Sequence, residues 1–166
     1  MSMSTYSSRC LVMIEGSTIA AAESCTGGLF ATRLTTMAGS SAYFLGGVVC
    51  YSNEMKTAWA DVPKELIAIK GAVSPEVAIA LADGIRRRVG STLGVGITGI
   101  AGPGGGSEEK PVGTVHIALA SGTAVRERAL RVPGDREMVR LQASQAALDL
   151  VRVHFLYNGT PPPQRA

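Results

Sequence analysis

Histidine and cysteine are scarce in this 166-residue sequence, which has two histidines and three cysteines. The cysteines, Cys10, Cys25 and Cys50, are odd in number, and no pair has the CxxC spacing of a metal site. We therefore expect reduced thiols, with neither a disulfide framework nor a bound metal. His116 falls in a strand-like segment and His154 in a helical one, so we expect both to be structural and neither to be a catalytic base.

Charged residues are also sparse, at 17% of the chain with a net charge of +3. No basic block is interleaved with aromatic residues, which makes nucleic acid a poor candidate partner. The one dense basic run, residues 86–88, ends a helical pattern, where cations interact favourably with the helix dipole. The longest apolar run near the start, residues 10–14, is too short for a signal peptide or a membrane span. We expect a cytoplasmic protein without a membrane partner.

Glycine and apolar residues are what the sequence has in quantity. The 20 glycines make up about 12% of the chain, against a usual ~7%, and 46% of the residues are hydrophobic. A chain of this length buries enough surface for one core, so the composition predicts a single folded domain and excludes general disorder. We assign residues 1–166 to that domain, with its core at about 11–157 and loose tails at both ends.

Strand-like and helical segments alternate in the first half of the chain, and a hairpin and a long helix close it. Predicted strands cover 18–23, 43–51, 92–98, 113–120 and 124–132, and predicted helices cover 26–36, 53–59, a segment from 63, a segment from 75 and 135–157. In the helix from Pro75, Val77, Leu81 and Ile85 recur every four residues, which indicates a buried face. This order predicts an α/β fold with a mixed sheet and helices on both faces. Ligands in such folds bind at the carboxyl ends of strands.

The segment Glu23–Gly28 combines small polar residues with two glycines where a strand meets a helix. Free N–H groups at a helix N-terminus attract an anion or a developing oxyanion, and glycine allows a substrate to approach them. Ser24 and Cys25 are both candidate nucleophiles, because the thiol is the more reactive group whereas a serine requires a nearby base. Alternatively, Ser24 or Thr26 only caps the helix.

Lys56 follows the second predicted strand, in the segment 51–56 (YSNEMK). The chain has four lysines beside twelve arginines, and lysine can lose its proton when desolvated whereas arginine cannot. A serine with a lysine or tyrosine as base is a known hydrolytic arrangement, and it would combine Ser24 with Tyr51 or Lys56. A solvated helix position is the simpler interpretation of Lys56 taken alone.

A glycine cluster lies between residues 94 and 113. Its start matches GxGxxG, but a proline and further glycines follow where a dinucleotide-binding fold needs a helix, and no acidic residue stands at the required distance. No Gly-Lys-Ser/Thr closes a Walker A loop either. A long glycine-rich loop at a strand end, with many N–H groups, suits a phosphate or ribose.

Arg136, next to a predicted N-cap at Asp135, would suit a carboxylate or phosphate, and a plain surface arginine is the alternative.

Five segments together resemble the CinA C-terminal domain family, whose members act as nicotinamide-nucleotide amidohydrolases. They are AESCTGG at 22–28, YSNEMK at 51–56, GAVS at 71–74, TGIAGPGGGSEEKPVGTV at 98–115 and GDR at 134–136. The resemblance extends from about Leu11 to Phe155. Some members carry a larger amino-terminal domain similar to molybdopterin-binding domains, for which no matching segment is found here, so the resemblance implies the stand-alone form.

The resemblance implies a three-layer α/β/α sandwich with a mixed sheet, assembled as a homodimer or higher homo-oligomer. The implied reaction is hydrolysis of the carboxamide of nicotinamide mononucleotide, a pyridine mononucleotide, to nicotinate mononucleotide and ammonia, without a metal or cofactor. Two alternatives stay open. One is a non-catalytic nucleotide-binding or interaction module of the same fold, and the other is the same chemistry on a different small amide.

The resemblance also implies roles for individual residues. Ser24 would be the nucleophile, and Tyr51 and Lys56 would activate it, with either of the two as the base. The implied substrate-binding residues are Thr26, Gly27, Gly28, Asn53, Thr98, Gly102, Gly104, Gly105 and Arg136. N–H groups near Gly27 and Gly28 would hold the oxyanion.

Overall fold

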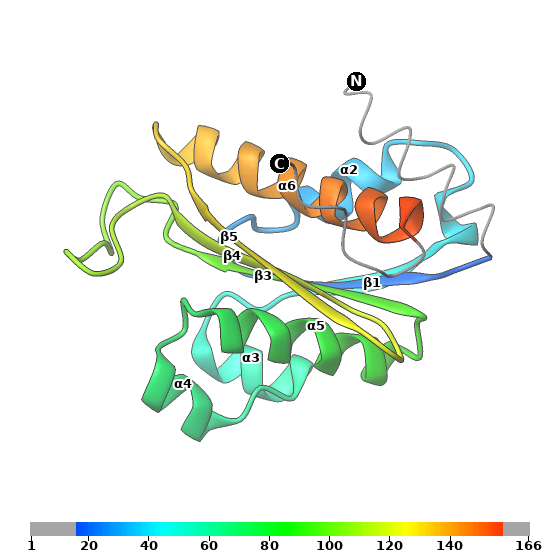
Figure 1. Ribbon diagram of the computed structural model, residues 1–166, viewed down its shortest axis with the longest axis horizontal. Coiled ribbons are helices and arrows are strands. Elements are labelled where there is room, and N and C mark those ends of the chain that lie inside the picture. The colour runs from blue at the N-terminus through cyan, green and yellow to red at the C-terminus, as the bar shows by residue number, and fades with distance from the viewer. Residues whose placement is uncertain (1–15, 158–166) are drawn as a thin grey trace.

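Residues 16–157 are described in a computed structural model, and they form a three-layer α/β/α sandwich (Figure 1). The central sheet has five strands in the order β2-β1-β3-β4-β5. The strands are β1 (Ile19–Glu23), β2 (Phe44–Val49), β3 (Leu93–Gly99), β4 (Thr114–Ala120) and β5 (Val125–Arg131). β1 pairs in parallel with β2 and β3, whereas β4 pairs antiparallel with β3 and β5. The predicted mixed sheet is therefore confirmed.

Helices cover both faces of the sheet (Figure 1). One face carries α2 (Leu29–Thr35) and α6 (Arg136–Leu156), and the other carries α3 (Asn53–Ala60), α4 (Lys64–Lys70) and α5 (Pro75–Val89). A short 3-10 helix, Ser40–Ala42, precedes β2. Each predicted strand and helix between residues 18 and 157 is present. The main difference is at α2, which begins at Leu29 instead of near residue 26.

Small residues allow α5 to lie close against the sheet. β1 is buried along its whole length, as expected for a strand with neighbours on both sides and helices on both faces. In β3, a Cβ atom at Gly94 or Gly96 would collide with the backbone carbonyl oxygens of Ala82 or Ala78 in α5. Two glycines of the cluster thus serve helix–sheet packing, which the sequence pattern alone did not reveal.

Side-chain caps fix where the two longest helices begin. The hydroxyl oxygen of Ser74 accepts the Val77 N–H at 3.3 Å at the start of α5. A carboxylate oxygen of Asp135 accepts the Met138 N–H at 2.9 Å at the start of α6, which confirms the predicted N-cap. The predicted tails, together with the first residues of the predicted core up to residue 15, lie outside the described residues.

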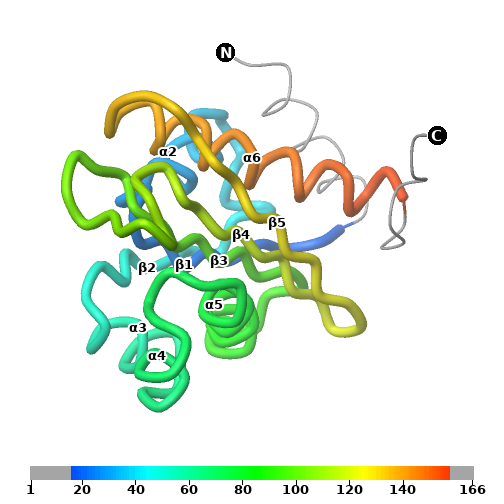
Figure 2. The backbone as a smooth tube through the Cα atoms, turned by 60° about the vertical axis from the view of Figure 1, so that its left-hand side comes forward, coloured from blue at the N-terminus to red at the C-terminus, as the bar shows by residue number. Residues whose placement is uncertain are grey.

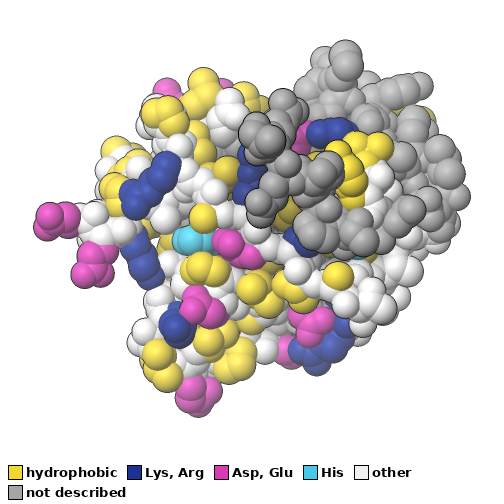
Figure 3. Space-filling model, viewed as in Figure 1, with side chains coloured by type: hydrophobic (Ala, Val, Ile, Leu, Met, Phe, Trp, Pro, Cys, Tyr) yellow, Lys and Arg dark blue, Asp and Glu magenta, His cyan; other side chains and the backbone are white. Residues whose placement is uncertain are grey.

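Charges of both signs are interspersed on the face seen in Figure 3, and no continuous basic surface is visible there. His116 Nδ1 lies 2.9 Å from Glu127 Oε1 on the neighbouring strand, so this histidine belongs to a cross-strand pair. Between residues 16 and 157, no helix is both long and apolar enough to cross a membrane. Within the same range, no group of three or more metal-ligating side chains is placed to hold a metal ion.

Candidate functional site

A cavity of about 290 Å³ opens at the carboxyl ends of the central strands. Ser24 directly follows β1, Tyr51 lies just beyond β2, and Thr98 is near the end of β3. The expected site residues that line this cavity are Ser24, Tyr51, Asn53, Lys56, Thr98, Gly102, Gly104, Gly105 and Arg136. Three expected substrate-binding residues, Thr26, Gly27 and Gly28, do not line it.

The turn after β1 is built around the buried carboxylate of Glu23, whose role the sequence analysis missed. Glu23 is 1% exposed, and its Oε2 accepts the Thr26 hydroxyl at 2.6 Å and the N–H groups of Gly28 and Phe30 at 3.1 Å. Its Oε1 accepts the Ala31 N–H at 2.8 Å. A carboxylate, not a hydroxyl group, therefore caps α2 and complements the positive end of its dipole. One feature of the sequence could have indicated this role: Glu23 is an acidic residue at the end of an apolar strand. A carboxylate buried there requires hydrogen-bond partners.

The amides of Gly27 and Gly28 already have acceptors inside the protein. Gly27 N–H donates to the Ser24 carbonyl oxygen at 3.0 Å, and Gly28 N–H donates to Glu23. These two donors are therefore not free to hold an oxyanion, which corrects the expectation from the sequence. Thr26 is fully buried, and its hydroxyl is held by the same carboxylate. The three residues shape the turn that presents Ser24.

Lys56 is buried on α3, with 2% of its surface exposed. Its Nζ donates to the carbonyl oxygens of Cys50 at 3.1 Å and Tyr51 at 3.4 Å. No carboxylate of residues 16–157 forms an ion pair with this ammonium group. Burial lowers the pKa of Lys56 below its ordinary value, because desolvation disfavours the charged form. Lys56 is thus not a solvated helix residue, and the shift of its pKa is in the direction that a general base requires.

Cys25 lines the same cavity but is a poor nucleophile. It is 5% exposed, and burial raises the pKa of its thiol to about 12. The thiolate is the reactive form of cysteine, so this thiol stays protonated and unreactive near neutral pH. Cys25 and Cys50 are both free thiols, and Cys10 lies outside the described residues. Of the two candidate nucleophiles, the environment favours Ser24.

Two arginines, one turn apart on α6, contact the segments around the cavity, and one of them, Arg136, lines it. Arg136 Nη2 donates to the Tyr51 hydroxyl at 2.7 Å, and its Nη1 donates to the Gly102 carbonyl oxygen at 2.8 Å. Arg140 Nη2 donates to the Thr26 carbonyl oxygen at 3.0 Å, so it holds the turn after β1. Arg136 therefore lines the candidate cavity, whereas a plain surface position was the alternative from sequence.

The glycine loop after β3 forms one wall of the cavity. The N–H groups of Gly104 and Gly105 donate to no protein acceptor in the described part of the chain. Thr98 donates its hydroxyl proton to the Ala72 carbonyl oxygen at 2.7 Å, which joins β3 to the connection before α5. At the far end of the loop, Lys110 Nζ donates to a backbone carbonyl at the end of α4. Hydrogen bonds from Thr98 and Lys110 thus hold the two ends of the loop, and the N–H groups of Gly104 and Gly105 remain available to a ligand.

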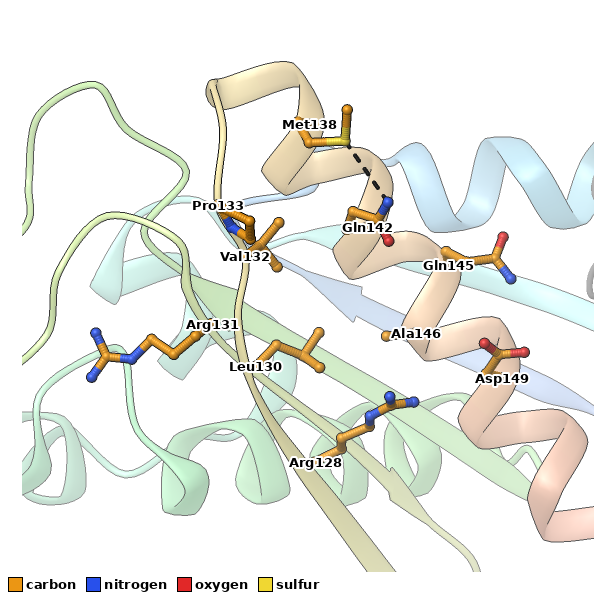
Figure 4. A pocket seen from close by; sticks show the side chains of 10 residues that line it. All are labelled: Arg128, Leu130, Arg131, Val132, Pro133, Met138, Gln142, Gln145, Ala146 and Asp149. Atoms are coloured by element: carbon orange, nitrogen blue, oxygen red, sulfur yellow. Dashed lines mark hydrogen bonds between the residues drawn. The ribbon is translucent and has the colours of Figure 1, made fainter.

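A larger hollow of about 450 Å³ lies elsewhere, between β5 and α6 (Figure 4). Its walls are apolar side chains such as Leu130 and Met138, together with arginine, glutamine and one aspartate. In Figure 4, Arg128 reaches toward the helix and Arg131 points away from it. Among the described residues, no serine, cysteine, lysine or histidine lines this hollow, so the smaller cavity is the better candidate for a nucleophile and a base.

The CinA C-terminal domain family matches residues 5–155 of the chain. A CinA-like protein of Koribacter versatilis is 60% identical over 143 residues, which are 85% of this chain and 34% of that protein. A CinA-like protein of Desulfotalea psychrophila is 54% identical over 142 residues, which are 86% of this chain and 34% of that protein. The chain therefore spans about a third of the length of these curated relatives.

Solved structures with the same fold cover nearly the whole chain. The crystal structure of a competence-damaged protein (CinA) superfamily protein from Klebsiella pneumoniae matches with a TM-score of 0.89 at 31% identity, covering 93% of this chain and 96% of that one. A competence/damage inducible protein from Agrobacterium tumefaciens matches with a TM-score of 0.85 at 38% identity, covering 91% of this chain and 97% of that one. By sequence and by fold, the chain belongs to the CinA C-terminal domain family.

Proposed function

We propose that this domain is an amidohydrolase that converts nicotinamide mononucleotide to nicotinate mononucleotide and ammonia. The observation that carries the proposal is a buried lysine that has no carboxylate partner among residues 16–157 and that lines the same cavity as the serine that follows β1. Ser24 is 8% exposed and Lys56 is 2% exposed. A serine nucleophile requires a base, and a desolvated lysine supplies one because part of its population is neutral.

In the proposed reaction, Ser24 Oγ attacks the carboxamide carbon while its proton passes to neutral Lys56 Nζ. The C–N bond of the tetrahedral intermediate then breaks, and Lys56 returns the proton to the departing ammonia. A water molecule attacks the resulting acyl-serine ester and gives its proton to Lys56. The ester C–O bond breaks and Lys56 returns the proton to Ser24 Oγ. The product leaves as the carboxylic acid and loses its proton to the released ammonia, which gives the carboxylate and ammonium.

Tyr51 is a positioning residue in this proposal, and Lys56 is the base. Tyr51 is 59% exposed, and its hydroxyl oxygen accepts a hydrogen bond from Arg136. Its carbonyl oxygen also accepts a hydrogen bond from Lys56 Nζ. Burial lowers the pKa of Lys56 and so favours the neutral form that a base requires.

The backbone N–H group of Cys25 is the oxyanion donor that we propose. It belongs to the residue after the nucleophile, the position that also supplies such a donor in nucleophile elbows. Cys25 lines the cavity, and its amide donates to no oxygen in the described residues, although it interacts with the residue's own thiol. A donor of this kind stabilises charge that develops on the carbonyl oxygen during attack.

The remaining polar groups of the cavity suit a ribose phosphate. The unused amides of Gly104 and Gly105 favour an anion, and the Arg136 guanidinium has donors left beyond its two hydrogen bonds. A volume of about 290 Å³ is at the lower end of small-molecule sites, which are roughly 300–1,000 Å³, and suits a mononucleotide better than a dinucleotide.

The test is incubation of the full chain with nicotinamide mononucleotide, followed by measurement of ammonia and nicotinate mononucleotide. We expect the two products in equal amounts. Calorimetric binding of the mononucleotide without product after long incubation would support a non-catalytic nucleotide-binding module instead. Ammonia release from another small amide, but not from the mononucleotide, would keep the serine–lysine chemistry and change the substrate.

A further inference from the structure

Two segments that are distant in the sequence both line the candidate cavity. One is the glycine loop between β3 and β4, residues 100–113, which contributes its first half. The other is the connection between α4 and α5, residues 71–74, which contributes Ala72 and Val73. The two segments lie on the same side of the molecule (Figure 2). The shape of the cavity therefore depends on how the loop is held against the connection.

The side chain of Lys110 joins the two segments. Its Nζ donates to the Lys70 carbonyl oxygen at 2.9 Å, at the point where α4 ends and the connection begins. Two glutamates directly precede Lys110, yet no carboxylate of residues 16–157 forms an ion pair with its ammonium group. The last carbonyl groups of a helix lack partners within the helix and accept hydrogen bonds from lysine side chains. The end of α4 is thus the acceptor that fixes Lys110.

Gly71 leaves room for the ammonium group of Lys110. A Cβ atom at position 71 would lie 3.1 Å from Lys110 Nζ, which is too close for an ordinary contact. The φ angle of Gly71 is +79°, in the region that favours glycine. The next residue is also held, because the Thr98 hydroxyl donates to the Ala72 carbonyl oxygen at 2.7 Å. The connection is therefore fixed both from β3 and from the glycine loop.

The backbone around Lys110 is itself closed by hydrogen bonds. The Lys110 N–H donates to Ser107 Oγ at 3.0 Å, and the Ser107 N–H donates to the Lys110 carbonyl oxygen at 3.0 Å. At the neck of the loop, the Gly113 N–H donates to the Ile100 carbonyl oxygen at 2.8 Å. The position of the Lys110 side chain is thus coupled to the path of the loop.

The two halves of the loop pack without spare room. A Cβ atom at Gly102 would lie 2.5 Å from Val112 Cγ1, and one at Gly106 would lie 2.7 Å from the Val112 backbone nitrogen. Gly102 and Gly106 flank the unused amides of Gly104 and Gly105 in the sequence. A shift of the second half of the loop, near Lys110, is therefore passed to the half that lines the cavity.

We propose that Lys110 is a positioning residue for substrate binding, which holds the glycine loop in place against the α4–α5 connection through its bond to Lys70. This role rests on the proposed function, in which the amides of Gly104 and Gly105 bind the phosphate of the mononucleotide. Lys110 is not among the residues that line the cavity. Loss of its bond leaves the loop to be ordered at the expense of binding, whereas the chemical step at Ser24 is unchanged in the bound complex.

The test combines steady-state kinetics with hydrogen exchange of the full chain. Lys110→Met keeps the apolar stem and removes the donor, and it should raise KM for nicotinamide mononucleotide about 5–30-fold with kcat within about twofold of wild type. Lys70→Met is the matched control, because it removes a lysine side chain but keeps the carbonyl oxygen that Lys110 uses. That side chain forms a surface ion pair with Glu76 at 2.9 Å, so both constants should stay within about twofold.

Two further measurements separate a lost hydrogen bond from other effects of the substitution. The rise in KM should persist at high salt, because salt screens a distant charge but does not replace a direct bond. In the free protein, the amides of residues 102–106 should exchange faster in Lys110→Met than in wild type, whereas those of β3 should not change. Lys70→Met should exchange as wild type does in both regions.

Wild-type KM in a folded Lys110→Met chain would overturn the proposal. So would a fall in kcat alone, an equal rise in KM in Lys70→Met, or a rise that high salt abolishes. If Lys110→Met does not fold, Lys110→Gln, which is shorter and uncharged, takes its place with the same expected results. Exchange is measured without substrate, so the two proposals fail separately. A wild type that releases no ammonia contradicts the amidase, whereas unchanged exchange of residues 102–106 in the variant contradicts the role of Lys110.

Discussion

Arg136 Nη2 lies 2.7 Å from the Tyr51 hydroxyl oxygen, which ties the start of α6 to the segment that leaves β2. The same guanidinium donates to the Gly102 carbonyl oxygen at 2.8 Å. One side chain therefore joins three segments that lie far apart in the sequence and that all line the cavity. Its position couples the glycine loop to the residues around Lys56.

Replacement of Arg136 with lysine should weaken substrate binding more than the chemical step. Lysine keeps the positive charge but lacks the planar fork that reaches Tyr51 and Gly102 together. Hydrogen bonds to charged groups contribute about 1.5–3 kcal/mol each, so we expect KM for the mononucleotide to rise about 10–100-fold with a smaller fall in kcat. Arg131→Lys on β5 is the matched control. An Arg136→Lys enzyme with wild-type KM would exclude this role.

The activity should rise with pH. In the proposed mechanism neutral Lys56 is the base, and burial lowers its pKa, so the active fraction should grow as pH increases through a value below the ordinary lysine pKa. A kcat/KM profile measured on the free enzyme should show this single rise. Lys56→Met, which keeps the buried chain length, should lower kcat by at least ~10²-fold. A flat profile from acid to alkaline pH would rule out a titrating lysine.

The Glu23 carboxylate should contribute strongly to stability. Glu23→Gln keeps the shape of the side chain but replaces one acceptor oxygen with an NH₂ group that faces backbone N–H donors. We expect the free energy of unfolding to fall by about 1.5–3 kcal/mol, measured by denaturant titration. Glu109→Gln, on the exposed loop, is the control and should change nothing. Equal stability of the two variants would show that the Glu23 network is dispensable.

Gly96 should tolerate no side chain, because a Cβ atom there meets the α5 backbone. Gly96→Ala forces the helix away from the sheet and should lower the free energy of unfolding by about 1–3 kcal/mol or more. Gly122→Ala, in the turn before β5, meets no atom within 4 Å and should stay within about 0.5 kcal/mol of wild type. Thermal unfolding of both variants checks this, and two equal melting temperatures would contradict it.

Local sequence patterns predicted the helices whose positions depend mainly on neighbouring residues. The four-residue repeat after Pro75 and the cap at Asp135 located α5 and α6 within a residue or two. The cap of α2 was missed because Glu23 reaches forward over a turn whose path depends on the surrounding strands. Hydroxyl caps are the common case, so the sequence favoured Ser24 or Thr26.

Contacts between segments that are distant in the sequence could not be predicted from local patterns. Gly94 and Gly96 stand in a glycine cluster that suggests a ligand loop, and only the approach of α5 to β3 assigns them to packing. The hydrogen bond between Arg136 and Tyr51 joins residues that are 85 positions apart in the sequence, so no local pattern predicts it. Burial of Lys56 likewise depends on how α3 packs, and not on its immediate neighbours.

The most direct test of the central claim compares ammonia release from nicotinamide mononucleotide by Ser24→Ala and Cys25→Ala, with circular dichroism to verify that both variants fold. Ser24→Ala should lose at least ~10³-fold in kcat, because this change removes the proposed nucleophile. Cys25→Ala keeps its backbone amide and should retain most of the activity. Full activity in Ser24→Ala, with loss in Cys25→Ala, would contradict the assignment of the nucleophile.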